Sequence, residues 1–371
     1  MASIRKRTWR TKAGEPRTAW LVDVLDRQGN RTAKQFTSLK EAKAYRSKIE
    51  TEINRGVYRV EAGKMTVADA VDLWLKHNDK REGVDLEPGT VADYRVKAGH
   101  LTQQSVARLK LADVTTGVVN DLFLDMLENG MPMPTAKRVV STLSAVFTYA
   151  MHNNWAALNP CAGRRTRVGA RASEAVTPPD HETVKRLLDA AYQTNLGFGL
   201  YVRLAVISGL RASEQRGLRW GDLDLKAGTV TVGTRLDRYN HRGDPKSRAG
   251  HRTIPLSPRL VAELRERKLR CGGREDMPVF TARGGAPFRH ENLMRSRWYP
   301  VRKAAGCPDV NWHALRHYAI STWIEAGLTP KAVQVRAGHS SIRITFDRYG
   351  HLFPSTEAGA ELAGIEARLD A

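Results

Sequence analysis

Cysteine and long apolar runs are both scarce in this sequence. Its three cysteines, Cys161, Cys271 and Cys307, are too few and too far apart for a disulfide framework or a CxxC metal clip. No apolar run approaches the roughly 18 residues that a membrane-spanning helix needs. The basic N-terminus is not followed by the apolar core of a secretory signal. We therefore expect a cytoplasmic protein in a reducing compartment, with no membrane partner.

Motifs for nucleotide hydrolysis and metal catalysis are missing as well. The sequence contains no GxxxxGK[ST] phosphate loop, no HExxH, no EF-hand loop and no GxSxG. Its 11 histidines do not cluster at zinc-ligand spacings. We therefore expect no bound metal and no other cofactor.

Acidic residues are few compared with basic ones. The chain has 60 Lys and Arg against 39 Asp and Glu, a formal net charge of +21. A chain this basic usually binds a polyanion, with nucleic acid the default and an anionic membrane surface the weaker alternative. Because hydrophobic residues make up 41% of its 371 residues, the chain has enough apolar material for two or three folded domains.

Residues 1–60 read as a small basic domain with three short strands, 3–10, 18–25 and 31–36, followed by a helix that Ser38 caps. Fifteen Lys and Arg against six Asp and Glu give this segment a net charge of +9. Such a sheet can lie in a DNA groove, and a solvated basic appendage is the simpler alternative. The candidate DNA-binding residues at its start are Arg5, Lys6 and Arg7.

The rest of the chain is predicted to be mainly helical. Residues 64–165 carry four helices with apolar stripes that indicate a core. A segment rich in Gly and Arg follows and reads as a linker, whose tentative phosphate contacts are Arg164, Arg165 and Arg167. Residues 174–371 combine helices with a hairpin of strands at 229–234 and 252–255. The predicted fold class is therefore multidomain, mainly α with small β parts, and the last domain is α+β.

Several cationic residues of the last domain have the character of a phosphate site. Arg211 follows an apolar helix and a glycine turn, at the start of a new helix, where phosphate is attracted. Glu214 lies one turn later and can orient the Arg211 guanidinium. Lys246 lies between the two predicted strands, where a long side chain can reach into a cleft.

Two further segments add histidine, arginine and tyrosine. His313 and Arg316 form an HxxR motif, whose i, i+3 spacing places both on one helix face. His339 follows a glycine turn, and Tyr349 comes ten residues later. Each residue alone is most simply a solvated charge or a core side chain. Only the ordered combination is informative.

That combination resembles the tyrosine recombinase family, the phage-type integrases that perform site-specific DNA recombination. The family pattern of Arg, Lys, His-x-x-Arg, His or Trp, and Tyr is filled here, in order, by Arg211, Lys246, His313, Arg316, His339 and Tyr349. The motifs cover about residues 174–355. Ala337 departs from the leucine that is common before the glycine. Tyr318 directly follows the HxLRH segment, so the resemblance assigns the nucleophile to Tyr349 and not to Tyr318.

The resemblance also implies a domain layout and a mechanism. Residues 1–60 would be an arm-type DNA-binding domain, 64–165 a helical, SAM-like core-binding domain, and 174–371 the catalytic domain with a C-terminal tail helix. Tyr349 would attack a phosphodiester to form a 3′-phosphotyrosyl intermediate, with neither metal nor ATP. The two arginines of the pattern would clamp the phosphate oxygens, with His313 as base, Lys246 as acid and His339 as a hydrogen-bond donor.

The implied partners are double-stranded DNA with core-type and arm-type attachment sites, and three further copies of the chain in a homotetramer on DNA. A host DNA-bending protein and an excision or directionality factor are further expected partners. The protein would then associate with the nucleoid of its host cell. The tail at 355–369 would pack on a neighbouring copy or on its own domain. Two alternatives remain open, a non-catalytic DNA-binding regulator with this fold and an activity like that of type IB topoisomerases.

Overall fold

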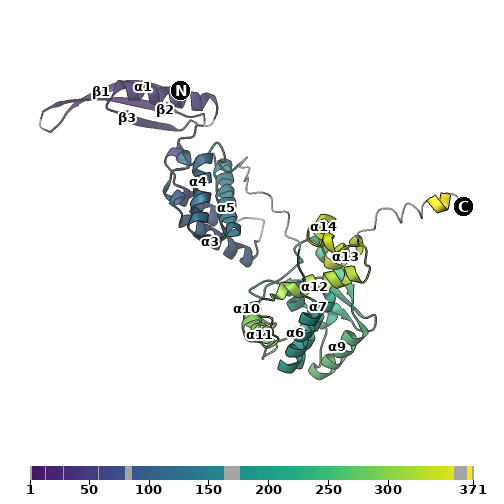
Figure 1. Ribbon diagram of the computed structural model, residues 1–371. Helices are drawn as coiled ribbons and strands as arrows, with labels where there is room; N and C mark the ends of the chain where they lie inside the picture. Colours follow the sequence, from purple (N-terminus) through teal and green to yellow (C-terminus); the bar gives the residue numbers. More distant parts are fainter. Residues whose placement is uncertain are drawn as a thin grey trace. The chain divides into compact units, whose positions relative to one another are not determined.

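A computed structural model describes residues 2–12, 14–27, 29–56, 58–79, 86–162, 176–354 and 366–369. They belong to two compact units, residues 1–167 and 168–371 (Figure 1). Helices dominate, and the sheets are small and antiparallel, which confirms the predicted fold class. The division of the first unit near residues 60–64 stays a prediction. The linker cations Arg164, Arg165 and Arg167 and the tail at 355–365 lie outside the described residues.

The first unit begins with a three-stranded antiparallel sheet in the order β1 (Ala2–Arg10), β2 (Pro16–Leu25), β3 (Arg31–Phe36). Helix α1 (Leu39–Asn54) packs against this sheet, and the Ser38 side chain caps it by accepting a hydrogen bond from the Lys40 amide. Val22 and Val24 of β2 are buried together with Ala42 and Ile49 of α1. The alternation of β2 therefore turns one face of the sheet to the helix.

The candidate DNA-binding residues of β1 lie on both faces of this sheet. Arg5 pairs with Asp23 at 2.8 Å, and its side chain is 62% exposed. Arg7 shares the face of Arg5 because strand residues alternate. Lys6 points to the opposite face, where its amino group lies 5.9 Å from the centroid of the Trp20 ring. Arg5 and Arg7 thus stand on the face that does not carry α1.

Four helices follow in the first unit: α2 (Val67–Asp79), α3 (Pro88–Thr102), α4 (Thr116–Glu128) and α5 (Met133–His152). Thr115 caps α4 by accepting a hydrogen bond from the Val118 amide. Their buried side chains are those of the predicted apolar stripes, among them Val71, Trp74, Leu122, Phe123, Leu143 and Phe147. The helical content predicted for this part of the chain is therefore confirmed.

The second unit is built around α7 (Leu196–Ser208), which is buried over most of its surface. It is contacted by α6 (His181–Thr194), α9 (Pro258–Cys271) and α12 (Trp312–Glu325). Helix α7 ends at Gly209, whose φ of 58° is left-handed, so the chain turns directly into α8 (Ala212–Gly217). This turn places Arg211 at the start of α8, as the sequence predicted.

Strand β5 (Thr229–Val232) pairs antiparallel with β8 (Arg252–Pro255), and β4 (Leu223–Asp224) pairs with the other edge of β5. Between the two predicted strands the structure inserts a second small sheet, β6 (Arg235–Leu236) with β7 (Arg242–Gly243). Lys246 therefore lies in the loop from β7 to β8 rather than at the tip of a simple hairpin. A loop that long can place a side chain away from the sheet.

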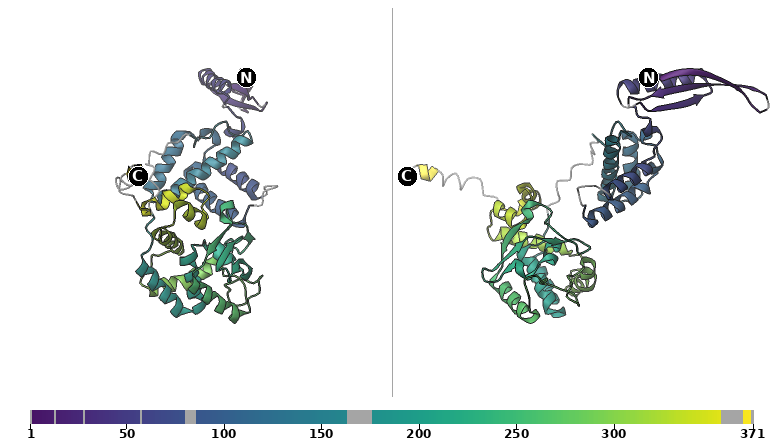
Figure 2. Two further views of the ribbon diagram at one scale, coloured as in Figure 1. Left: turned by 90° about the vertical axis from the view of Figure 1, so that its right-hand side faces the viewer. Right: turned by 180° about the vertical axis from the view of Figure 1, so that it is seen from behind.

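The remaining helices are α10 (His290–Leu293), a π-helical turn at Met294–Trp298, α11 (Tyr299–Ala304), α13 (Pro330–Ala337) and α14 (Ile342–Tyr349). Helices α13 and α14 lie at the opposite end of the second unit from α9 (Figures 1 and 2). Within the described ranges, no helix has both the length and the apolar character that crossing a bilayer demands.

Candidate active site

Two arginines of the predicted set converge on the turn that follows α13. Arg316 on α12 donates from Nη2 to the carbonyl of Ala337 and from Nη1 to the carbonyl of Gly209, each at 2.6 Å. Arg211 donates from Nη2 to the carbonyl of Gly338 at 2.8 Å. Residues that lie more than a hundred positions apart in the sequence are thereby fixed around one turn.

Glu214 orients Arg211, as the spacing predicted. Its Oε1 accepts a hydrogen bond from Arg211 Nη1 at 2.7 Å, and its Oε2 accepts one from the Arg211 backbone amide at 2.9 Å. Burial alone would raise the pKa of Glu214. The hydrogen bonds and charge of Arg252, together with Arg211, outweigh burial and lower this pKa to about 2. Glu214 is therefore a buried carboxylate at neutral pH.

Arg316 is buried, with 4% of its surface exposed. Burial, followed by the positive charge of Arg211, lowers the pKa of Arg316 to about 9. The guanidinium is still protonated at neutral pH. Two arginines that crowd one turn in this way create a site of strong positive potential.

Tyr349 is the last residue of α14 and faces this potential. It is 1% exposed, and its Oη lies 2.5 Å from Nδ1 of His317 in a hydrogen bond. Burial raises the pKa of Tyr349 to about 12, while the charges of Arg316 and Arg348 act in the opposite direction. The phenol is therefore protonated at neutral pH in this state.

Two imidazoles lie beside the phenol, and a third lies next to one of them. The ring of His339 stacks on that of Tyr349 with a centroid distance of 6.2 Å, and His339 Nδ1 is hydrogen-bonded to Thr345 Oγ1 at 3.0 Å. His313 meets His317 edge to face at 4.6 Å. Burial and then the nearby positive charges lower the pKa of His339 to about 3 and that of His317 to about 4. These rings are neutral at pH 7, so each has one nitrogen that can accept a proton.

His313 stands at the edge of this group, on the exposed side of α12. Partial desolvation by the surrounding protein lowers its pKa, and the charges of Arg316, Arg348 and Arg211 lower it further. The imidazole next to the Tyr349 hydroxyl is that of His317, one helical turn after His313. The HALRH segment thus supplies two histidines on one helix face.

Lys246 is exposed in the β7–β8 loop and forms no hydrogen bond or ion pair with the described residues. Hydrogen bonds, ring contacts and charge interactions link five of the six residues predicted from the sequence, and Lys246 takes part in none of them. These five are Arg211, His313, Arg316, His339 and Tyr349.

Sequence reasoning missed three residues of the site: Arg252, His317 and Arg348. Arg348 directly precedes Tyr349, and its charge lowers the pKa values of the surrounding histidines. His317 was visible as the second histidine of HALRH, four residues after the first. No local pattern pointed to Arg252, because two of its three partner residues lie in distant segments of the chain.

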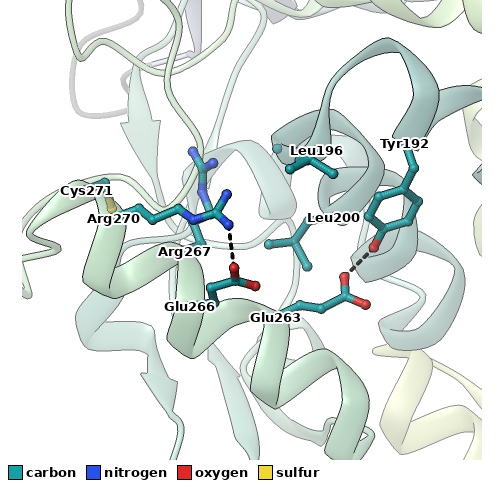
Figure 3. A pocket seen from close by; sticks show the side chains of 9 residues that line it. Tyr192, Leu196, Leu200, Glu263, Glu266, Arg267, Arg270 and Cys271 are labelled. Atoms are coloured by element: carbon teal, nitrogen blue, oxygen red, sulfur yellow. Dashed lines mark hydrogen bonds and ion pairs between the residues drawn. The ribbon is translucent and has the colours of Figure 1, made fainter.

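A cavity of about 410 Å³ lies elsewhere on the second unit, between α6, the start of α7 and α9 (Figure 3). Its lining includes Tyr192, Leu196, Glu263, Arg267 and Cys271. Tyr192 is hydrogen-bonded to Glu263, and Arg267 donates to the Val279 carbonyl at 2.8 Å. None of the residues predicted from the sequence lines this cavity, so the candidate site is the cluster around Tyr349.

Comparisons with known proteins agree with the family resemblance that the sequence motifs indicated. The model of the phage integrase family matches residues 180–356, which include all six predicted catalytic positions. The chain is 26% identical over 369 residues to a XerC-like tyrosine recombinase of Caldanaerobacter subterraneus subsp. tengcongensis, covering 90% of this chain and 92% of that relative. It is also 26% identical to the transposase of transposon Tn916 from Enterococcus faecalis, covering 91% and 86%.

Solved structures share the fold. The integrase of transposon Tn1549, solved in complex with a circular intermediate DNA, matches with a TM-score of 0.67 and 21% identity over 82% of this chain and 99% of that one. Lambda integrase, solved as a dimer bound to a COC′ core site, matches with a TM-score of 0.58 and 18% identity over 95% and 97%.

Proposed function

The chain belongs to the tyrosine recombinases of the phage integrase family, and from this premise we propose that Tyr349 cuts and rejoins DNA through a 3′-phosphotyrosyl intermediate. The enzyme is a site-specific DNA recombinase. The observation that carries the residue assignment is the burial of a single tyrosine hydroxyl among two arginines and two neutral imidazoles. Such surroundings suit a phenol that must lose its proton as it attacks a phosphate.

The arginines supply the electrostatic part of the proposed mechanism. Negative charge grows on the non-bridging oxygens as the phosphodiester becomes pentavalent, and fixed cations stabilise it. Arg211 and Arg316 are already held by carbonyls of the same turn, so little reorganisation is needed when phosphate binds. We assign both to the phosphate clamp. His339, beside Tyr349, is the further hydrogen-bond partner of the scissile phosphate.

The imidazoles supply the proton acceptor. His313 fills the family position for the base, and His317 contacts the hydroxyl directly. A neutral His317 accepts the phenolic proton at the distance that general-base catalysis requires. We therefore propose His317 as the immediate acceptor in this state, with His313 next to it. Lys246, in the β7–β8 loop, is assigned as the acid that protonates the leaving 5′-oxygen.

The covalent step conserves the energy of the broken bond. Tyr349 Oη attacks phosphorus, the phosphorus–oxygen bond to the 5′-oxygen breaks, and that oxygen takes a proton. A 5′-hydroxyl of a second strand then attacks the phosphotyrosine and releases Tyr349. Because the bond count is unchanged, the reaction requires neither ATP hydrolysis nor an external oxidant or reductant.

Multimeric assembly on double-stranded DNA follows from the family, and we propose a homotetramer as its form. We further propose that the second unit and the preceding helices bind core-type sites, while the basic sheet of residues 1–60 binds arm-type sites. Two linked binding modules raise the effective concentration of each at its site. This arrangement would call for a host DNA-bending protein and a directionality factor, and would place the enzyme at the host nucleoid.

The test is a nicked suicide substrate that traps the covalent adduct. Wild-type protein should form an adduct in EDTA, and Tyr349→Phe should bind the same DNA without forming one. The matched control is Tyr239→Phe, which removes an exposed hydroxyl of the same unit. An adduct with Tyr349→Phe would disprove the assignment of the nucleophile.

The same assay separates the two alternatives. A non-catalytic regulator would bind the DNA and give no adduct with the wild-type chain. An activity like that of type IB topoisomerases would relax supercoiled plasmids that carry no attachment site. The proposed recombinase should require paired sites to produce recombinant DNA.

A further inference from the structure

The geometry points to Arg252 as a positioning residue of the active site. It neutralises Glu214 and thereby leaves the charge of Arg211 available to the substrate phosphate. This inference rests on the proposed function, because it concerns the clamp of the same site. Arg252 is the first residue of β8 and lies outside the six-residue family pattern.

Four of the five N–H groups of Arg252 have a hydrogen-bond acceptor, and three of these acceptors belong to residues far away in the sequence. Nη2 and Nη1 donate to the two oxygens of Glu214 at 2.9 and 3.2 Å. Nη1 also donates to the Gly250 carbonyl at 2.9 Å, and Nε donates to the Arg336 carbonyl at 2.8 Å. One side chain thus connects α8, the end of the loop that carries Lys246, and the end of α13.

The packing around this guanidinium is tight. A Cβ on Gly338 would lie 2.9 Å from both Arg252 Nη1 and the Ala249 carbonyl, and Gly338 has a left-handed φ of 65°. The turn whose carbonyls accept hydrogen bonds from Arg211 and Arg316 therefore packs directly against Arg252. Lysine could not replace it here, because a single ammonium lacks the planar fork that reaches both carboxylate oxygens and two carbonyls.

The charge count explains why the site needs this residue. Arg211, Glu214 and Arg252 together carry a net charge of +1. The side chains of Glu214 and Arg252 are 1% and 2% exposed, whereas that of Arg211 is 33% exposed. Without Arg252, the carboxylate of Glu214 would be balanced by Arg211 alone. The accessible guanidinium would then present almost no net charge to a phosphate.

The experiment compares a charged with a neutral scissile group in the nicked suicide substrate. One substrate carries the ordinary phosphodiester, and the other carries a methylphosphonate, which lacks the negative oxygen that the clamp neutralises. Arg252→Met should slow adduct formation about 100-fold on the phosphodiester and at most about 10-fold on the methylphosphonate. A general loss of folded enzyme would slow both reactions by the same factor.

A compensating double variant tests the charge argument directly. Glu214→Gln combined with Arg252→Met restores the net charge of +1 on the remaining Arg211. It should therefore react faster on the phosphodiester than Arg252→Met alone. Arg259→Met, which removes an exposed cation of α9 from its pair with Glu263, is the control and should react like wild type on both substrates.

The outcomes separate this inference from the proposed function. Equal losses on the two substrates, or no gain in the double variant, would overturn the role of Arg252 while wild-type cleavage stands. A wild-type chain that forms no adduct with either substrate would overturn the proposed function and this inference with it.

Discussion

Replacing the buried carboxylate of Glu214 should destabilise the second unit by an amount that depends on pH. The pKa of Glu214 is about 2 in the folded chain and 4.5 in the unfolded reference. This difference corresponds to about 3 kcal/mol of stability at neutral pH. It agrees in size with the roughly 3–5 kcal/mol that breaking a buried ion pair costs. Glu214→Gln should therefore unfold the unit about 100-fold more readily at pH 7.

The sign of the pH dependence follows from the lowered pKa. A carboxyl whose folded pKa is depressed contributes its full stabilisation above pH 4.5 and loses it as the pH falls toward 2. The stability difference between wild type and Glu214→Gln should therefore fall to about half of its neutral value at pH 3. The histidines titrate in both proteins, so the difference isolates Glu214.

The assay is urea unfolding followed by hydrogen exchange in peptides from α7 and α12, which report on the second unit alone. Glu266→Gln is the control, because Glu266 and its partner Arg270 are both 61% exposed. An exposed pair of this kind contributes at most about 1 kcal/mol. A difference between wild type and Glu214→Gln that stays constant from pH 7 to pH 3 would refute the reasoning.

Three further predictions concern DNA. His317→Asn should slow adduct formation at least about 100-fold in the suicide-substrate assay, because the phenol loses its proton acceptor; an unchanged rate would return the role of base to His313. The double variant Arg5→Gln, Arg7→Gln should weaken binding to arm-type DNA and reduce the slope of log affinity against log salt by about 2; an unchanged slope in fluorescence anisotropy would contradict this. Burial, and after it the nearby arginine charges, lowers the pKa values of His317 and His339. A bound phosphate should offset the charge contribution and raise both pKa values, so binding of core-type DNA near pH 5 should take up protons. Calorimetry that gives the same binding enthalpy in buffers of different ionisation heat would exclude this uptake.

The sequence predicted most of the fold because the elements follow local rules. Ser38 caps its helix as its position suggested. The buried stripe of α5 and the apolar surface of α7 were readable from residue spacing. The small sheet of β6 and β7 was missed, because each of its strands has two residues and no detectable period.

Sequence motifs also predicted part of the candidate site, but they missed the residues whose roles depend on contacts between distant segments. The HALRH segment and the Gly338–His339 turn can be recognised from short sequence motifs. The proposed role of Arg252 depends on its contacts with Glu214 and Arg336, which lie 38 and 84 positions away in the sequence. A strand that begins with arginine is also common in a chain with this charge, so it gives no signal of its own. The choice between His313 and His317 also depends on side-chain geometry, because both lie on the same face of α12.

In the proposed mechanism, the electrostatics of the site would make the phenol of Tyr349 a nucleophile only when DNA is bound. Burial raises the pKa of Tyr349 to about 12. Burial, reinforced by the charges of His313, Arg348 and Arg316, lowers the pKa of His317 and keeps it neutral. A phosphate that enters between Arg211 and Arg316 neutralises part of this positive charge, which makes His317 more basic. The acceptor thus gains strength when the substrate arrives, so proton transfer from Tyr349 is coupled to phosphate binding. A site that works in this way would suppress reaction of the phenol away from DNA without any separate inhibitory element.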